Sequence, residues 1–94
     1  MLVPHDMKGQ IIGVLGLGES GLAAIAALEA AGAHVFAFDD VKTQPDIPQI
    51  NLTDWRDWPW NKLEALVISP GIPHNNPTPH PAAALANRKH IQII

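Results

Sequence analysis

Short apolar runs alternate with alanine-rich or polar segments along the 94 residues of the chain. Five runs have the length of buried strands: Ile11–Leu15, His34–Asp39, Gln49–Leu52, Leu63–Ser69 and Ile91–Ile94. Two segments between them have the composition of helices: Leu22–Ala31, and Ala82–Lys89 after a proline that suits a helix start. This alternation predicts an α/β fold, a Rossmann-like open parallel sheet of about five strands with helices on both faces.

The first predicted helix, Leu22–Ala31, is apolar nearly all round, so we expect it to be buried on more than one side. Gly32 suits its C-terminal stop. With a strand order of 3-2-1-4-5, the first and fourth strands are neighbours, and a ligand binds beyond their carboxyl ends. The loops after these two strands then face each other, with Asp39 beside them.

Composition narrows the class of protein. Hydrophobic residues make up 47% of the chain, too many for a disordered segment, and a net charge of −3 argues against a nucleic-acid platform. The absence of cysteine excludes disulfides and thiolate metal sites and fits a reducing cytosol. The scattered histidines lack the spacing of metal ligands, so no metal site is expected. The length predicts one domain over residues 1–94, and a chain that ends inside an apolar strand suggests a fragment of a longer protein.

Three glycines follow the first strand at the spacing G-x-G-x-x-G, in the stretch IIGVLGLGESG. Gly16 allows a tight turn, Gly18 leaves room for an anionic ligand, and Gly21 lets the helix pack against the strand. A strand, glycine loop and helix in this order hold a phosphate at the helix N-terminus, which favours a nucleotide diphosphate over a purely structural turn. Ser20 offers its hydroxyl either to a phosphate or as a helix cap, and residue type alone favours the cap.

Two further segments are candidates for ligand contact. Asp39 ends the second strand, where dinucleotide sites hydrogen-bond a ribose hydroxyl, and Asp40 adds a charge that argues against NADP. The loop after the fourth strand, Ser69–Ile72, faces the glycines, although Pro-Gly also fits a plain turn. The paired carboxylates lie on a strand-end turn that suits recognition rather than acid–base catalysis, so no catalytic residue is assigned.

Three tryptophans, Trp55, Trp58 and Trp60, lie between the third and fourth predicted strands. They could stack on nucleic-acid bases, but few basic residues stand nearby. We therefore expect them to be packing residues.

Three segments together, GLGESG, AGAHVFAFDD and ALVISPGIP, resemble the N-terminal domain of the Mur ligases, and among these the D-glutamate-adding members. The resemblance runs from Lys8 to Ile94. It implies an ATP-dependent cytoplasmic amide ligase of peptidoglycan precursor synthesis, in which this domain binds the UDP moiety of UDP-N-acetylmuramoyl-L-alanine. A central ATP-binding domain and a C-terminal D-glutamate-binding domain would complete the parent, which uses ATP and Mg. The chain has no G-x-x-x-x-G-K-[ST] loop, so we expect this fragment to bind no cofactor and to be inactive alone.

The resemblance also implies roles by position. Leu17, Gly18, Glu19 and Ser20 would meet uridine and diphosphate, Asp39 and Asp40 the uracil or ribose, and the uracil side would be lined by Ser69, Pro70, Gly71 and Ile72. Two departures bear on this. Val41 stands where some members carry a basic residue, and Glu19 places an acid in the phosphate loop.

Two other functions remain open on the residues themselves. The same glycine fingerprint serves the NAD-binding domain of a dehydrogenase. A non-catalytic nucleotide-sensing or dimerising module is the other, with the apolar helix Leu22–Ala31 facing a partner.

Overall fold

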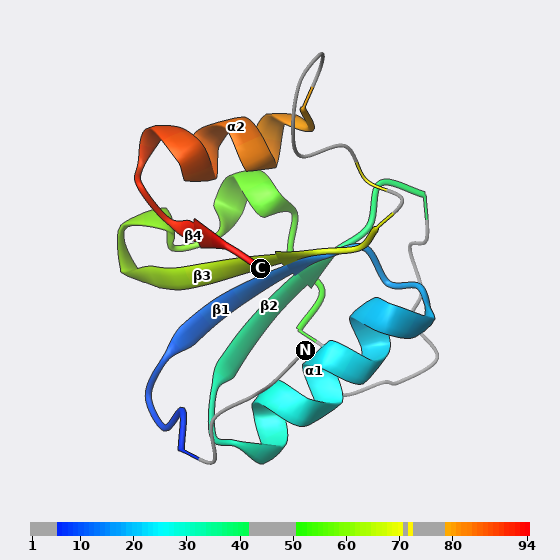
Figure 1. The fold of residues 1–94 in the computed structure, drawn as a ribbon, viewed down its shortest axis with the longest axis vertical. Coiled ribbons are helices and arrows are strands. Elements are labelled where there is room, and N and C mark those ends of the chain that lie inside the picture. The colour runs from blue at the N-terminus through cyan, green and yellow to red at the C-terminus, as the bar shows by residue number, and fades with distance from the viewer. Residues whose placement is uncertain (1–5, 42–50, 71, 73–78) are drawn as a thin grey trace.

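The computed structural model describes residues 6–41, 51–70, 72 and 79–94. Its elements are β1 (Ile11–Leu15), α1 (Glu19–Ala30), β2 (His34–Phe38), the 3-10 turns η1 (Trp55–Asp57) and η2 (Trp60–Lys62), β3 (Leu63–Ile68), α2 (Pro81–Arg88) and β4 (Gln92–Ile93). The strands form one parallel sheet in the order β2-β1-β3-β4 (Figure 1). The predicted α/β class is confirmed, with four strands in the described part of the chain instead of about five.

The missing strand is the third of the predicted five, Gln49–Leu52, whose first two residues lie outside the described residues. Leu52 makes a single parallel bridge to Ala37 of β2. The extended segment stops there because the Asp54 side chain accepts a hydrogen bond from the Arg56 amide and so starts η1. The bridge still lies at β2, the side of the sheet that the predicted order requires.

The strand order reverses at β1. Leu15 is in register with Phe38 of β2 on one side and with Ile68 of β3 on the other. The predicted first and fourth strands are therefore sheet neighbours, and the loops that follow them leave the sheet at the same edge.

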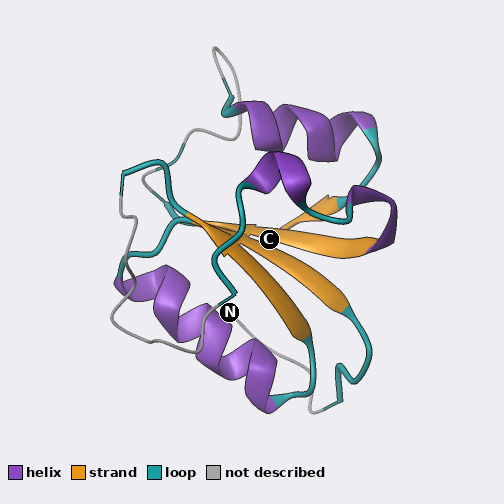
Figure 2. Ribbon diagram, turned by 180° about the vertical axis from the view of Figure 1, so that it is seen from behind, coloured by secondary structure: helices purple, strands orange, loops and turns teal. Residues whose placement is uncertain are grey.

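The helices cover opposite faces of the sheet (Figure 2). On the α1 face, Ile12 and Val14 pack with Ile25 and Leu28 of the helix. On the other face, residues such as Leu66 pack with the tryptophans and with the small side chains of α2. Right-handed crossovers place the two helices on opposite faces, because the connection from β1 to β2 and the connection from β3 to β4 run in opposite directions across the sheet.

The tryptophans pack in the core, as expected from the few basic residues around them. Trp55, Trp58 and Trp60 have exposed fractions of 9%, 4% and 8%. The indole N–H of Trp58 donates to the carbonyl of Thr53, and that of Trp60 donates to the carbonyl of Trp55, each at 2.7 Å. Their polar atoms are thus satisfied inside the protein, as buried indoles require.

Helix α1 differs from its prediction at both its start and its burial. It begins at Glu19, three residues before the predicted Leu22, and Gly32 ends it with a φ of +97°. Its buried residues form one face, while Ala23, Ala26 and Ala27 are exposed. The expectation of burial on more than one side is therefore not met in this chain.

The C-terminal part agrees with its prediction except at the ends of its elements. Helix α2 includes Pro81 at its first position, and β4 is limited to Gln92–Ile93.

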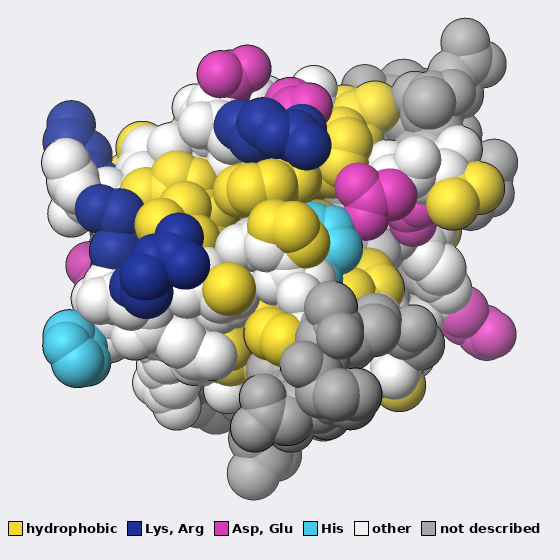
Figure 3. Space-filling model, turned by 90° about the horizontal axis from the view of Figure 1, so that it is seen from above, with side chains coloured by type: hydrophobic (Ala, Val, Ile, Leu, Met, Phe, Trp, Pro, Cys, Tyr) yellow, Lys and Arg dark blue, Asp and Glu magenta, His cyan; other side chains and the backbone are white. Residues whose placement is uncertain are grey.

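No helix in the described part of the chain is long and apolar enough to cross a bilayer. Seen from above, basic, acidic and apolar side chains are interspersed on the surface (Figure 3).

Candidate functional site

The glycine loop joins β1 to α1 at the carboxyl edge of the sheet, and two of its glycines are needed by the backbone itself. Gly16 has a φ of +102°, and a Cβ atom there would lie 2.7 Å from the Ser69 Cβ. A Cβ atom on Gly21 would run into the carbonyl oxygen of Gly16. Gly21 thus permits a close approach between the first turn of α1 and the loop, close to the role that was predicted for it.

Gly18 is different, because the fold makes no such demand on it. Its φ is −74°, and no atom of the described residues lies within 4 Å of the position that a Cβ atom would occupy. The residue is exposed at the N-cap of α1. The space around it is therefore open to a ligand.

The first amides of α1 have no hydrogen-bond acceptor within the helix. The first backbone hydrogen bond of the helix runs from the Leu22 amide to the Gly18 carbonyl at 2.9 Å, so the amides of Glu19, Ser20 and Gly21 have no acceptor within the helix. Ser20 lies inside the first turn, so the expectation that it caps the helix is wrong: the N-cap is Gly18, which makes no side-chain cap. Glu19 is exposed, and its charge is favourable at the positive end of the helix dipole.

Asp39 holds the glycine loop. One oxygen of its carboxylate accepts from the Leu17 amide at 2.7 Å, and the other accepts from the Val41 amide at 2.8 Å. The Leu17 side chain is fully buried, so this contact fixes the loop against the core. The structure thus brings Asp39 to the glycines, as predicted, through a contact to the protein backbone.

The loop after β3 also meets the glycines. The Ser69 amide donates to the Leu15 carbonyl and the Ile72 amide donates to the Ser69 carbonyl, each at 3.0 Å, which closes a turn. The Ser69 hydroxyl is buried, faces Gly16 and has no hydrogen-bond partner among the described residues. Pro70 is exposed, and Gly71, also a predicted site residue, lies outside the described residues.

One contact at this edge was missed by sequence reasoning. His80 lies 2.6 Å from Asp40, measured between the ring Nε2 and a carboxylate oxygen. The ring Nδ1 accepts from the Ala82 amide, which caps α2, so Nε2 carries the proton and donates to Asp40. The position of His80 just before Pro81 was a signal for a helix cap. No sequence pattern indicated its contact with Asp40, which lies 40 residues earlier in the chain.

These features define the class of the chain: a Rossmann-like α/β domain with a glycine loop at the point where the strand order reverses. Comparison with curated proteins finds UDP-N-acetylmuramoylalanine–D-glutamate ligases along the whole chain. The protein of Rhodospirillum rubrum is 40% identical over 102 residues, which cover 99% of this chain. The proteins of Rhodopseudomonas palustris strain HaA2 and Rhizobium meliloti are 42% and 37% identical, and each match covers 100% of it.

The chain spans 21% of the length of these three curated relatives. No family model and no solved structure matches it. The resemblance to the Mur ligases, and among them to the D-glutamate-adding members, is confirmed over the whole chain.

Proposed function

We propose that this chain is the domain of a D-glutamate-adding ligase that binds the UDP moiety of UDP-N-acetylmuramoyl-L-alanine. The observation that carries the proposal is the contrast among the three glycines. Gly16 and Gly21 are required by close backbone approaches, whereas Gly18 is exposed, unstrained and surrounded by open space. A glycine that the fold does not need is explained by a ligand that approaches the backbone at that point.

The diphosphate would lie at the start of α1. The amides of Glu19, Ser20 and Gly21 lack acceptors in the helix, and the helix dipole favours a negative group there. The buried Ser69 hydroxyl lies across the loop and is a donor without a described partner. A phosphate oxygen or a bound water is the kind of acceptor that such a hydroxyl requires.

The nucleoside would lie on the side of the second acidic residue. Asp40 has one carboxylate oxygen engaged by His80, while its side chain remains half exposed. Asp40 would then contact the uracil or ribose, and the loop Ser69–Ile72 would line the uracil side. Asp39 and Leu17 contribute by holding the loop in shape.

The chemical step would belong to the rest of the ligase. ATP, Mg and D-glutamate would be held by a central and a C-terminal domain, and the reaction would take place in the cytoplasm. The 94 residues contain no G-x-x-x-x-G-K-[ST] loop, so this chain alone has neither ATP turnover nor amide formation.

The test is calorimetry of the chain with UDP, UDP-N-acetylmuramoyl-L-alanine and NADH. Gly18→Val should keep its fold and bind UDP at least about tenfold more weakly, because the branched side chain fills the approach to the amides. Ala26→Val, at an exposed position of α1, is the matched control and should bind UDP as the parent chain does. Unchanged UDP affinity in a folded Gly18→Val variant, or a preference for NADH, would overturn the proposal.

A further inference from the structure

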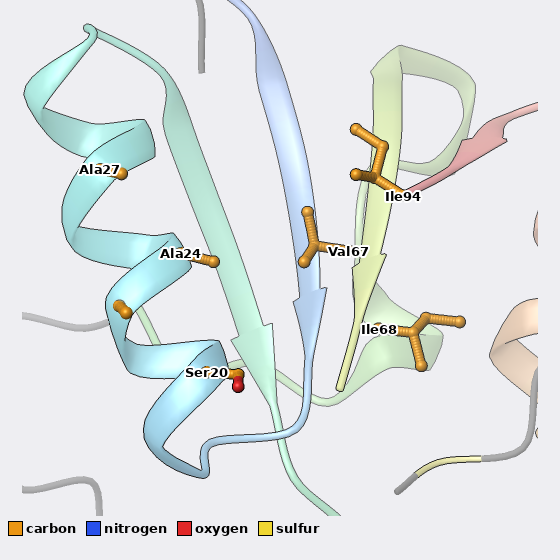
Figure 4. A pocket seen from close by; sticks show the side chains of 7 residues that line it. Ser20, Ala24, Ala27, Val67, Ile68 and Ile94 are labelled. Atoms are coloured by element: carbon orange, nitrogen blue, oxygen red, sulfur yellow. The ribbon is translucent and has the colours of Figure 1, made fainter. Parts of the chain in front are cut away.

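A groove remains on the α1 face of the sheet, beside the helix. Its volume is about 370 Å³, and it lies between α1 and the side of the sheet that carries β3 and Ile94 (Figure 4). Ala23, Ala24 and Ala27 form the helix wall, and Val67 and Ile94 form the sheet wall. The hydroxyl-bearing Ser20 stands at the end nearest the glycine loop. The walls are thus mostly apolar.

The strand register explains why this face is bare. Leu66 pairs with Ile93, so the next pair along the strands sets Ile94 beside Val67 on the α1 face. Ile93 points to the opposite face and packs against the core that includes α2. Helix α2 packs against β4 on one face, whereas the main contacts of α1 on the other face are with β1, β2 and β3.

The Ile94 side chain is the more exposed of the two apolar side chains on the sheet wall of the groove. Its exposed fraction is 49%, against 8% for Val67. Parallel sheets occur almost only with both faces buried, and a helix wall of bare alanines has no charged side chain to meet water. Both walls of the groove therefore have the apolar, uncharged character of a surface that another segment covers.

We infer that this groove is the seat of the segment that directly follows Ile94 in the full-length ligase. The inference rests on the chain being part of a longer ligase, as proposed above, and does not depend on nucleotide binding. Ile94 itself forms the groove wall, so the next residues begin beside it. The chain spans only 21% of its curated relatives, which leaves ample length to supply the segment.

The occupant must present mainly apolar side chains, because the side chains that line the groove are apolar apart from Ser20. A segment seated there would contact α1, whose first turn belongs to the glycine loop. The following part of the ligase and the nucleotide loop would then share one rigid helix.

Thiol labelling tests this inference directly. The chain has no cysteine, so Ala27→Cys introduces the single thiol of these residues into the groove wall. Ala26→Cys is the matched control, since Ala26 is exposed on α1 but does not line the groove. In the full-length ligase, maleimide should modify Ala27→Cys at least about tenfold more slowly than Ala26→Cys, because labelling requires the covering segment to open. The modified α1 peptide is quantified by mass spectrometry.

The 94-residue chain, checked for cooperative unfolding, supplies the reference state. There the two thiols should react at comparable rates, because the 94-residue chain lacks the covering segment. Equal rates in the full-length ligase would overturn the inference. Protection of Ala27→Cys that grows with the concentration of the short chain would also overturn it, by making a second copy the occupant. Ala23→Cys repeats the test one helical turn earlier, and no arm of the experiment uses a nucleotide, so its failure is distinct from failure of UDP binding.

Discussion

The carboxylate of Asp39 accepts a hydrogen bond from the amide of Leu17 at 2.7 Å, across 22 positions of the chain. This contact ties the end of β2 to the glycine loop that follows β1. The second oxygen of the Asp39 carboxylate accepts from the Val41 amide, so both carboxylate oxygens bind backbone amides. The acid predicted to recognise a ligand thus also shapes the loop that would receive it.

Asp39→Asn should lower the free energy of unfolding by about 1–2 kcal/mol, because an amide side chain has one acceptor oxygen and cannot serve both backbone amides. Urea denaturation measures the change. Asp57→Asn, at an exposed carboxylate of η1, is the control and should change stability by less than about 0.5 kcal/mol. Equal stability of the two variants would show that Asp39 does not hold the loop.

Gly21→Ala should destabilise the protein and Gly18→Ala should not, although the two positions lie only three residues apart. The new methyl group of Gly21→Ala meets the Gly16 carbonyl, which is backbone and cannot swing aside, so a loss of about 2 kcal/mol or more is expected. Gly18→Ala should stay within about 0.5 kcal/mol of the parent, because the poorer cap offsets the gain from a less flexible unfolded chain. Thermal unfolding distinguishes them, and similar losses at both positions would contradict the assignment of Gly18 to a ligand.

Gly13→Ala should destabilise the sheet from its centre. A Cβ atom at Gly13 would lie 2.5 Å from Cζ3 and 2.8 Å from Cε3 of Trp58, so a loss of about 1–3 kcal/mol is expected. Trp58→Leu should partly relieve the crowding, with a coupling on the order of 1 kcal/mol in a double-mutant cycle.

The control for that cycle is Leu28→Ala on the other face of the sheet, which should combine additively with Gly13→Ala. If Trp58→Leu is equally additive, the ring does not set the requirement for glycine at this position.

His80→Ala should cost about 1 kcal/mol of stability, since it removes the cap of α2 together with the contact to Asp40. His80→Asn should recover most of this loss, because asparagine also accepts from the Ala82 amide. Urea denaturation of the two variants separates the cap from the contact. A loss that His80→Asn leaves unrepaired would assign the stability to Asp40 or to the edge-on ring contact with Trp55.

Local chemistry was enough to predict most elements of this chain. The apolar run Ile11–Leu15 is β1 with the same bounds, and Gly32 ends α1 in the left-handed conformation that favours glycine. The fourth predicted strand begins at Leu63, as β3 does. Such signals depend on residues that are adjacent or a few positions apart, so the sequence contains them directly.

Contacts between distant segments were decided only by the tertiary structure. The sequence marks Gly16, Gly18 and Gly21 alike, yet only the packing of the loop separates the two that the backbone needs from the one that stands open. The contact of Asp40 with His80 joins positions 40 residues apart. No local pattern specifies which pairs meet, because that depends on the strand order and on the faces to which the crossovers send each helix.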